Sequence, residues 1–463
     1  MKFRSLTIAL LSLASMLLLV AGPTFAQSRK ERDEAKKFKE AATIAIRQKN
    51  FRAAADSYGK ALALVPNDSD ALYRKGFAHY SLKENDNAIR DLSTALDKGF
   101  KPALDIYRIR HFVYFDQKNY DAALADVQKG LQIAPNDVEF LSRLGEIQME
   151  RRAFPEALAA VEKASNASPN NADLYYTKSR VFAATGDAKG QADSAATALG
   201  KGTRYPAEAY LLLGDASQKL QKPDAAIDAY QKSINARPDN LQAYRTLSEI
   251  YRSENRFDDA IRASKLGLMA FPANGELFID LGLYYSLAER DKDAIEAGRS
   301  AVGLLPNNYS GHTNLCRAYN ETKEFSLAIG TCNRALHLKP GDGETLFYLG
   351  RAQTGANKKA DAAKTFAQAV TGLLSTTVAN PRSSEAWYLL GNAYFSDTKY
   401  DQAIDAYMKS IAISPKFAKA RYNLAVIYTN FRKNKEKAVE QYDRIAPVDT
   451  RLAGLLRKEI DKM

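Results

Sequence analysis

Apolar side chains recur at helical spacing along almost the whole chain after residue 34. Trp387, Leu390 and Tyr394 stand at i, i+3 and i+7, so they share one face of a helix. Gly391 lies within that face, and other segments carry a small residue at the same place. A small residue lets a second backbone approach closely, while large neighbours fill the remaining space. The pattern predicts pairs of packed helices that bury their apolar faces only against adjoining pairs.

Proline positions show that this pattern repeats with a period of about 34 residues, which lies in the range typical of helical repeat arrays. Because proline lacks the amide hydrogen that a helix needs, each one is predicted to mark the end of a unit. The prolines concerned are Pro66, Pro135, Pro169, Pro238, Pro272, Pro306, Pro340, Pro381 and Pro415. A row of small residues has the same period and comprises Ala42, Gly76, Gly145, Ser179, Gly214, Ser248, Gly282, Cys316, Gly350, Gly391 and Ala425. An internal repeat of this length predicts a solenoid.

The unit closest to an ideal repeat resembles the tetratricopeptide family in its key positions. These positions are Trp387, Leu390, Gly391, Tyr394, Tyr400, Ala403, Tyr407 and Pro415. Twelve such units start at Ala35, Ser69, Leu104, Val138, Ala172, Ala207, Leu241, Gly275, Tyr309, Gly343, Ser384 and Ala418. The resemblance implies an all-α fold, a right-handed α-solenoid superhelix of about twelve helix–turn–helix repeats. It also implies a concave groove that grips peptides or partner proteins.

The N-terminal segment, residues 1–26, has the features of a secretion signal. Lys2 and Arg4 precede an apolar run over residues 6–20, which is short for a membrane span. Small residues then lead to a predicted cleavage site after Ala26. We therefore expect a periplasmic or secreted protein. The alternative is an uncleaved anchor.

Behind the signal, the chain divides into three predicted parts. Residues 27–34 are expected to be a charged linker, and residues 35–448 the repeat array. Residues 449–463 have an amphipathic pattern and are expected to form a helix that caps the array. No later apolar run reaches the length of a membrane-spanning helix, so no membrane span is expected after removal of the signal.

Three departures from the repeat are visible. Gly99 and Gly202 lie in unit endings that lack the usual proline and carry one extra residue, so they are either bends or drift without consequence. The third departure is a seven-residue insertion within residues 370–380. Seven residues make about two helical turns, which predicts a lengthened second helix carrying Leu373, Leu374 and Val378. The alternative is a loop.

The two cysteines fall in the ninth predicted repeat. Cys316 occupies the row of small residues, and Cys332 lies on the facing side of the second helix. Because paired helices pack closely, a disulfide is one expectation in an oxidising compartment. Two buried free thiols are the other.

No arrangement of residues suggests catalysis, a metal or a cofactor, so a non-enzymatic protein is expected. The four histidines fall in different repeats, and the glycines belong to packing rows instead of phosphate loops. The formal net charge is +12, but the basic residues are distributed along the chain and mixed with acidic ones. This distribution argues against nucleic-acid binding. Acids that recur at helix starts, such as Glu276 and Glu344, are explained by the helix dipole.

In the resembled family the first helix of each repeat lines the groove. Candidate groove residues outside the packing rows are Tyr73, Arg74, Phe77, Arg108, Phe112, Arg143, Tyr176, Arg180, Arg245, Asn314, Arg317, Tyr348, Arg351, Asn392, Tyr422 and Asn423. Arginines interleaved with aromatic residues suit extended peptides or acidic segments. The alternative for any one arginine is a solvated surface position.

The main functional hypothesis is a scaffold that binds a peptide or protein partner in this groove, in cell-envelope assembly or export. The alternative is an accessory of an export machine that binds an anionic exopolysaccharide. These two partners differ in the salt dependence that they predict, because binding of a polyanion weakens steeply with added salt.

Overall fold

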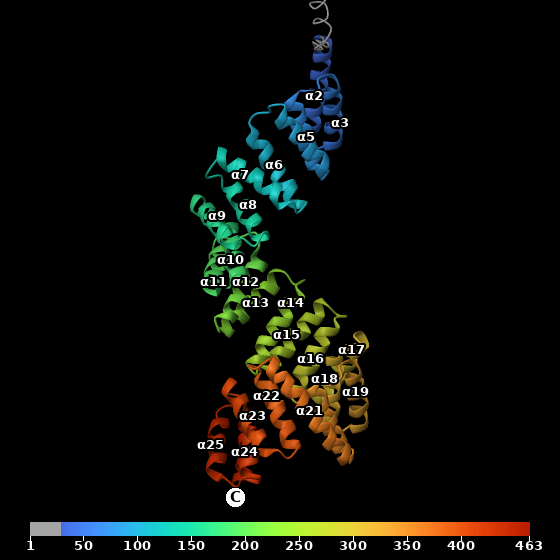
Figure 1. The fold of residues 1–463 in the computed structure, drawn as a ribbon, viewed down its shortest axis with the longest axis vertical. Coiled ribbons are helices and arrows are strands. Elements are labelled where there is room, and N and C mark those ends of the chain that lie inside the picture. Colours follow the sequence, from blue (N-terminus) through green and yellow to red (C-terminus); the bar gives the residue numbers. More distant parts are fainter. Residues whose placement is uncertain (1–28) are drawn as a thin grey trace, which may run out of the picture. The chain divides into compact units, whose positions relative to one another are not determined.

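The computed structural model describes residues 29–463, so the predicted signal at 1–26 lies outside the described residues. The described part contains 25 helices and no strand (Figure 1). The helices of the first half are α2 (Arg29–Arg47), α3 (Phe51–Leu64), α4 (Ser69–Ser81), α5 (Asn85–Asp97), α6 (Ala103–Asp116), α7 (Tyr120–Ile133), α8 (Val138–Glu150), α9 (Phe154–Ala167), α10 (Ala172–Thr185), α11 (Ala188–Gly200) and α12 (Pro206–Lys219).

The second half continues in the same alternation of helix and short turn. Its helices are α13 (Pro223–Ala236), α14 (Leu241–Ser253), α15 (Phe257–Ala270), α16 (Gly275–Leu287), α17 (Asp291–Leu304), α18 (Tyr309–Glu321), α19 (Phe325–Leu338), α20 (Gly343–Gly355), α21 (Lys359–Ala379), α22 (Ser384–Ser396), α23 (Tyr400–Ile413), α24 (Ala418–Asn430), α25 (Lys435–Ile445) and α26 (Thr450–Ile460). Contacts join five consecutive pairs in the first half, from α2–α3 to α10–α11, and six in the second, from α14–α15 to α24–α25, which α26 follows.

Helix starts agree closely with the repeat starts expected from the sequence. Nine of the twelve first helices begin at the predicted residue, and α6 and α12 begin one residue earlier, at Ala103 and Pro206. The first repeat differs more, because α2 already begins at Arg29. The expected linker at 27–34 is therefore helical from residue 29, since the Lys, Arg and Glu residues of this stretch are good helix formers.

Local chemistry explains where the first helices begin. Asn171, Asn240, Asn274 and Asn308 precede first helices, and each side chain accepts a hydrogen bond from a backbone amide of the first turn. These caps satisfy donors that the helix itself leaves unpaired. Each cap follows soon after a proline that the preceding helix does not enter. The proline therefore marks the connection between repeats, as predicted.

The chain separates into two compact units, which are described separately. One comprises the described residues up to Leu220, and the other runs from Gln221 to Met463. Gly99 and Gly202 both lie in the first unit, in turns with φ of 78° and 77°. A side chain is strained in this left-handed conformation, which accounts for glycine at both places. That they bend the array stays a prediction.

The two helices of a repeat meet at one small position on the first helix and one position sixteen residues later on the second. A Cβ added at Gly76 would lie 2.7 Å from Leu92, and one at Gly391 would lie 2.5 Å from Tyr407. A large residue on the second helix therefore fills the space that the glycine leaves. In the third repeat His111 occupies the small position and is fully buried.

The insertion in the tenth repeat is helical, and the alternative of a loop is wrong. Helix α21 has 21 residues, whereas its counterpart α19 in the preceding repeat has 14. Of the residues expected on its added turns, Leu373 is buried, while Leu374 and Val378 are 41% and 81% exposed. At the C-terminus α26 packs on α24 and α25. Its Leu452, Leu456 and Ile460 are buried.

Candidate functional site: a pocket on the first helices of repeats eight to twelve

A pocket of about 680 Å³ lies in the second unit, on the side formed by its first helices. Its walls come from α16, α18, α20, α22 and α24, together with the turn after α16, the first residue of α17, a tyrosine of α23 and the turn before α24. The structure brings six predicted groove residues together here: Arg317, Tyr348, Arg351, Asn392, Tyr422 and Asn423. Phe347, Tyr388, Phe395, Tyr407 and Phe417 make the rest of the wall strongly aromatic.

Arg317 is the most buried charge in this wall, with 9% of its surface exposed. Its guanidinium forms an ion pair with Glu344 and lies 4.9 Å from the ring centroid of Tyr348. Burial raises the pKa of the Glu344 carboxyl, an effect that the nearby guanidinium opposes. The Nε atom of Arg317 has no hydrogen-bond partner among the described residues. Arg317 therefore keeps one donor for which the protein supplies no acceptor.

A chain of neutral hydrogen bonds crosses the pocket beside these charges. The Oδ1 atom of Asn392 accepts hydrogen bonds from the Tyr407 hydroxyl at 2.7 Å and from the Asn423 amide at 2.8 Å. The Asn423 amide also lies 3.4 Å from the Tyr388 hydroxyl. These bonds use the oxygen of the Asn392 amide and the nitrogen of the Asn423 amide, and they hold both amides in fixed orientations. Such oriented donors and acceptors suit a polypeptide backbone.

Acidic side chains balance the basic ones in the pocket wall. Arg351 forms hydrogen bonds of 2.7 and 3.3 Å with Glu321, and Glu289, Asp291 and Glu385 also line the wall. Desolvation, and next the charges of Glu321 and Glu289, raise the pKa of Asp291. The pocket is therefore mixed in charge rather than electropositive.

Most of the expected groove arginines are engaged in ion pairs between or within repeats. Arg108 pairs with Glu139, Arg245 with Glu276, and Arg317 with Glu344, each across a boundary between successive repeats. The expectation of a row of arginines available to acidic segments is wrong for these positions. The first-turn acids, which the helix dipole alone seemed to explain, are their partners. Arg245 also binds Asp280 at 2.7 Å.

Other predicted residues make contacts within one repeat or between neighbouring repeats. In the second unit Asn314 donates to the carbonyl oxygen of Ile279 at 3.1 Å. In the first unit Tyr73 stacks on Phe100 with ring centroids 4.2 Å apart, and Arg74 binds Asp70 at 2.9 Å. These contacts give the three positions a structural role.

Aromatic contacts account for the other predicted residues of the first unit. The Phe77 and Phe51 rings lie edge to face, and the Tyr176 and Tyr205 rings are stacked with centroids 4.9 Å apart. Arg143 lies 4.4 Å from the ring of Phe112 and bonds to Glu146 at 2.6 Å. Arg180 lies 5.9 Å from the ring of Tyr176.

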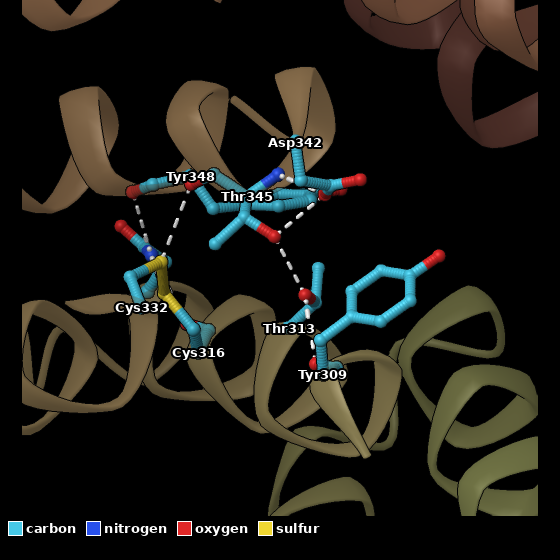
Figure 2. Close-up of a disulfide and its surroundings, with 8 residues drawn as sticks. Tyr309, Thr313, Cys316, Cys332, Asp342, Thr345 and Tyr348 are labelled. Carbon is cyan, nitrogen blue, oxygen red and sulfur yellow. Dashed lines mark hydrogen bonds between the residues drawn. A yellow bond between two sulfur atoms is a disulfide. The ribbon is translucent and has the colours of Figure 1, made fainter. Parts of the chain in front are cut away.

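Behind the pocket wall, a disulfide joins the two helices of the ninth repeat. Figure 2 shows the Cys316–Cys332 bond, with a Cα–Cα distance of 5.4 Å, next to α20. Both residues are fully buried. The amide of Asn320, one turn after Cys316, donates to the carbonyl oxygen of Tyr348 at 3.1 Å. The disulfide thus joins α18, which carries Arg317, to α19, and the Asn320 hydrogen bond links α18 to α20, which carries Tyr348.

Comparison with protein-family models identifies the repeat. Models described as tetratricopeptide repeat match residues 39–103, 114–181 and 207–240, and a model described as TPR repeat matches residues 391–430. The chain is a tetratricopeptide repeat protein. An array of such repeats is a protein–protein interaction scaffold and in general non-enzymatic.

Similar proteins share the repeat over limited stretches. A peroxisomal targeting signal receptor of Kluyveromyces lactis is 39% identical over 59 residues, which are 13% of this tetratricopeptide chain and 10% of the receptor. The chain thus spans only a tenth of that relative. The structure of MamA is 23% identical, covers 38% of this chain and 95% of its own, and has a TM-score of 0.34. The Cut9–Hcn1 structure is 14% identical, covers 94% of this chain and 97% of its own, and has a TM-score of 0.41.

Several pocket residues of the tetratricopeptide array escaped the sequence analysis. Tyr407 belonged to the repeat pattern and Glu385 to the acids at helix starts, and neither Tyr388 nor Glu321 was among the candidate groove residues. A usable signal was the identical sequence separation between Arg108 and Glu139 and between Arg245 and Glu276. Within residues 29–463 no cluster of His, Cys, Asp and Glu has the form of a metal site. Over the same residues, no helix is long and apolar enough to cross a membrane.

Proposed function

We propose that the pocket of repeats eight to twelve binds a segment of a partner protein. The observation that carries this proposal is the convergence of Arg317, Tyr348, Asn392 and Asn423 on one cavity of about 680 Å³. Aromatic rings and oriented amides are groups that recognise a polypeptide segment.

A protein partner fits this wall better than an anionic polysaccharide does. Arg317 and Arg351 are already paired with Glu344 and Glu321, so a polyanion would have to displace carboxylates from both. A polypeptide, which carries donors, acceptors and apolar groups, can use the amides and rings without breaking these pairs.

The proposed setting is the cell envelope, in assembly or export. The predicted signal at residues 1–26 supports this placement, and so does the disulfide, since such bonds persist in oxidising compartments. In this setting the array would hold one protein in place for another component of the envelope.

Site-specific photo-crosslinking tests the proposal in cells that produce the protein. A photoreactive residue at Tyr422 lies in the pocket wall, whereas one at Met408, which is 52% exposed on α23, lies outside it. We expect a protein adduct at Tyr422, absent at Met408 and weakened by Asn423→Ala. Equal adducts at both positions would rule out the pocket. Binding of purified protein to polygalacturonate that disappears with added salt would instead favour the polysaccharide alternative.

A further inference from the structure

Two ion pairs in the second unit join repeats that are far apart in the sequence. Arg252, in the last turn of α14, donates to Glu385, in the first turn of α22, at 2.9 Å across 133 residues. Arg451 of α26 donates to Glu289, in the turn after α16, at 2.6 Å across 162 residues. Repeats seven to twelve therefore curl until α22 reaches α14 and the capping helix reaches repeat eight.

The first of these pairs depends on the insertion in α21. Arg317 is the ninth residue of α18 and binds Glu344, the second residue of α20. Arg351 and Glu385 hold the equivalent places in α20 and α22, yet Arg351 binds Glu321 instead. The seven added residues lie between them, so Glu385 is carried away from its regular partner and meets Arg252.

Glu385 also stands between two pockets. A second pocket, of about 520 Å³, is lined by Arg252, Arg382 and Asp449 among others. Leu287, Glu385, Phe417 and Lys419 line both this pocket and the one described above. The wall between the two cavities therefore includes the Arg252–Glu385 pair.

We propose that the Arg252–Glu385 pair is a latch, and that opening it joins the two pockets into one groove for an extended polypeptide segment. This inference rests on the proposed function for the nature of the ligand. Both side chains are partly exposed, and ion pairs in such surroundings are weak, so a ligand can displace the latch. An extended chain follows from the shape, because two cavities separated by one ion pair form a continuous path once that pair opens.

Distance measurements between spin labels test the latch in the free protein, without any ligand. Cysteine labels replace the exposed residues Glu254, just after α14, and Arg382, just before α22. Cys316 and Cys332 remain unlabelled because they are bonded to each other. We expect one short, narrow distance distribution for the otherwise unchanged protein. Glu385→Arg, which places two cations together, is expected to shift it to longer and broader distances.

A charge swap and a matched control make the result specific. Glu249 also binds Arg252 in the unchanged protein, so the swap combines Glu385→Arg and Arg252→Glu with Glu249→Gln, and it is expected to restore the short distances. Asp401→Arg reverses a first-turn acid of the same repeat that pairs with Arg432 of the next repeat, and should leave the distances unchanged. An unchanged distribution in Glu385→Arg, or no restoration in the swap, overturns the latch. Because no partner is present, this failure is distinct from a failure of the crosslinking at Tyr422.

Discussion

The ring of Tyr407 lies against the backbone of Gly391, and its hydroxyl emerges beside the next residue, where it donates to Asn392 at 2.7 Å. A residue of the second helix thereby reaches the groove formed by the first helices. Only a glycine leaves room for this passage, because a Cβ at position 391 would lie 2.5 Å from the ring. Tyr407 thus packs the two helices of the repeat together with its ring and contributes to the pocket wall with its hydroxyl.

Replacing this glycine is expected to destabilise the second unit. Gly391→Ala gains helix propensity, yet the fully packed Tyr407 ring cannot yield, so we expect a net loss of about 1–2 kcal/mol. Gly282→Ala is the control, because a Cβ there would meet its nearest neighbour at an ordinary 3.6 Å. Urea unfolding of both variants, followed by circular dichroism, checks this. Equal stabilities for the two variants would contradict the packing argument.

Removal of the disulfide is expected to lower stability. The bond closes a loop between residues 16 apart, and a loop of this size corresponds to about 3 kcal/mol on the chain-entropy model. Cys316→Ser with Cys332→Ser is a suitable variant, since Ser248 and Ser264 occupy the same two places in repeat seven. Unfolding with and without reductant measures the effect. Two reactive thiols in the unfolded, unreduced protein would show that the bond is absent in solution.

Buried His111 is expected to make the first unit sensitive to mild acid. Desolvation, and next the charges of Arg143 and Arg108, lower the pKa of its imidazole from 6.5 to about 3. The unfolded state then binds more protons below pH 6.5, so stability present above that pH is lost as the pH falls toward 3. The expected slope is about 1.4 kcal/mol per pH unit.

The variant His111→Leu isolates this contribution. Thermal unfolding between about pH 7.5 and about pH 5 should show a flatter profile for the variant than for the unchanged protein, because leucine does not titrate. That window lies above the range in which most carboxylates titrate. Parallel profiles would mean that His111 is not the group responsible.

Cleavage of the predicted signal is expected to leave Gln27 as the first residue of the exported protein. Intact mass and N-terminal sequencing of protein from the envelope fraction measure this directly. Ala26→Arg places a large charged residue at the cleavage position and should cause accumulation of the precursor. A native chain that still begins at Met1 would establish the alternative of an uncleaved anchor.

The sequence by itself determined the repeat and its local details. The first-helix starts, the lengthened α21 and the facing positions of Cys316 and Cys332 all follow from periods and spacings within one repeat. These features depend on backbone hydrogen bonds and on packing between neighbouring helices, which act within one repeat and its neighbours. Because the same short-range interactions recur in every repeat, the sequence pattern that reflects them also recurs and can be recognised.

The tertiary structure alone decided which of the candidate residues face the pocket and which are used up in ion pairs. Arg317 and Arg351 look alike in the sequence, yet one binds the following repeat and the other the preceding one. Glu385 binds Arg252, which lies 133 residues earlier in the sequence. The repeat pattern does not predict a contact between residues so far apart. Small rotations between successive repeats accumulate into a curl, and a seven-residue insertion changes its course. The accumulated rotation determines which residues line the pocket and brings Glu385 next to Arg252.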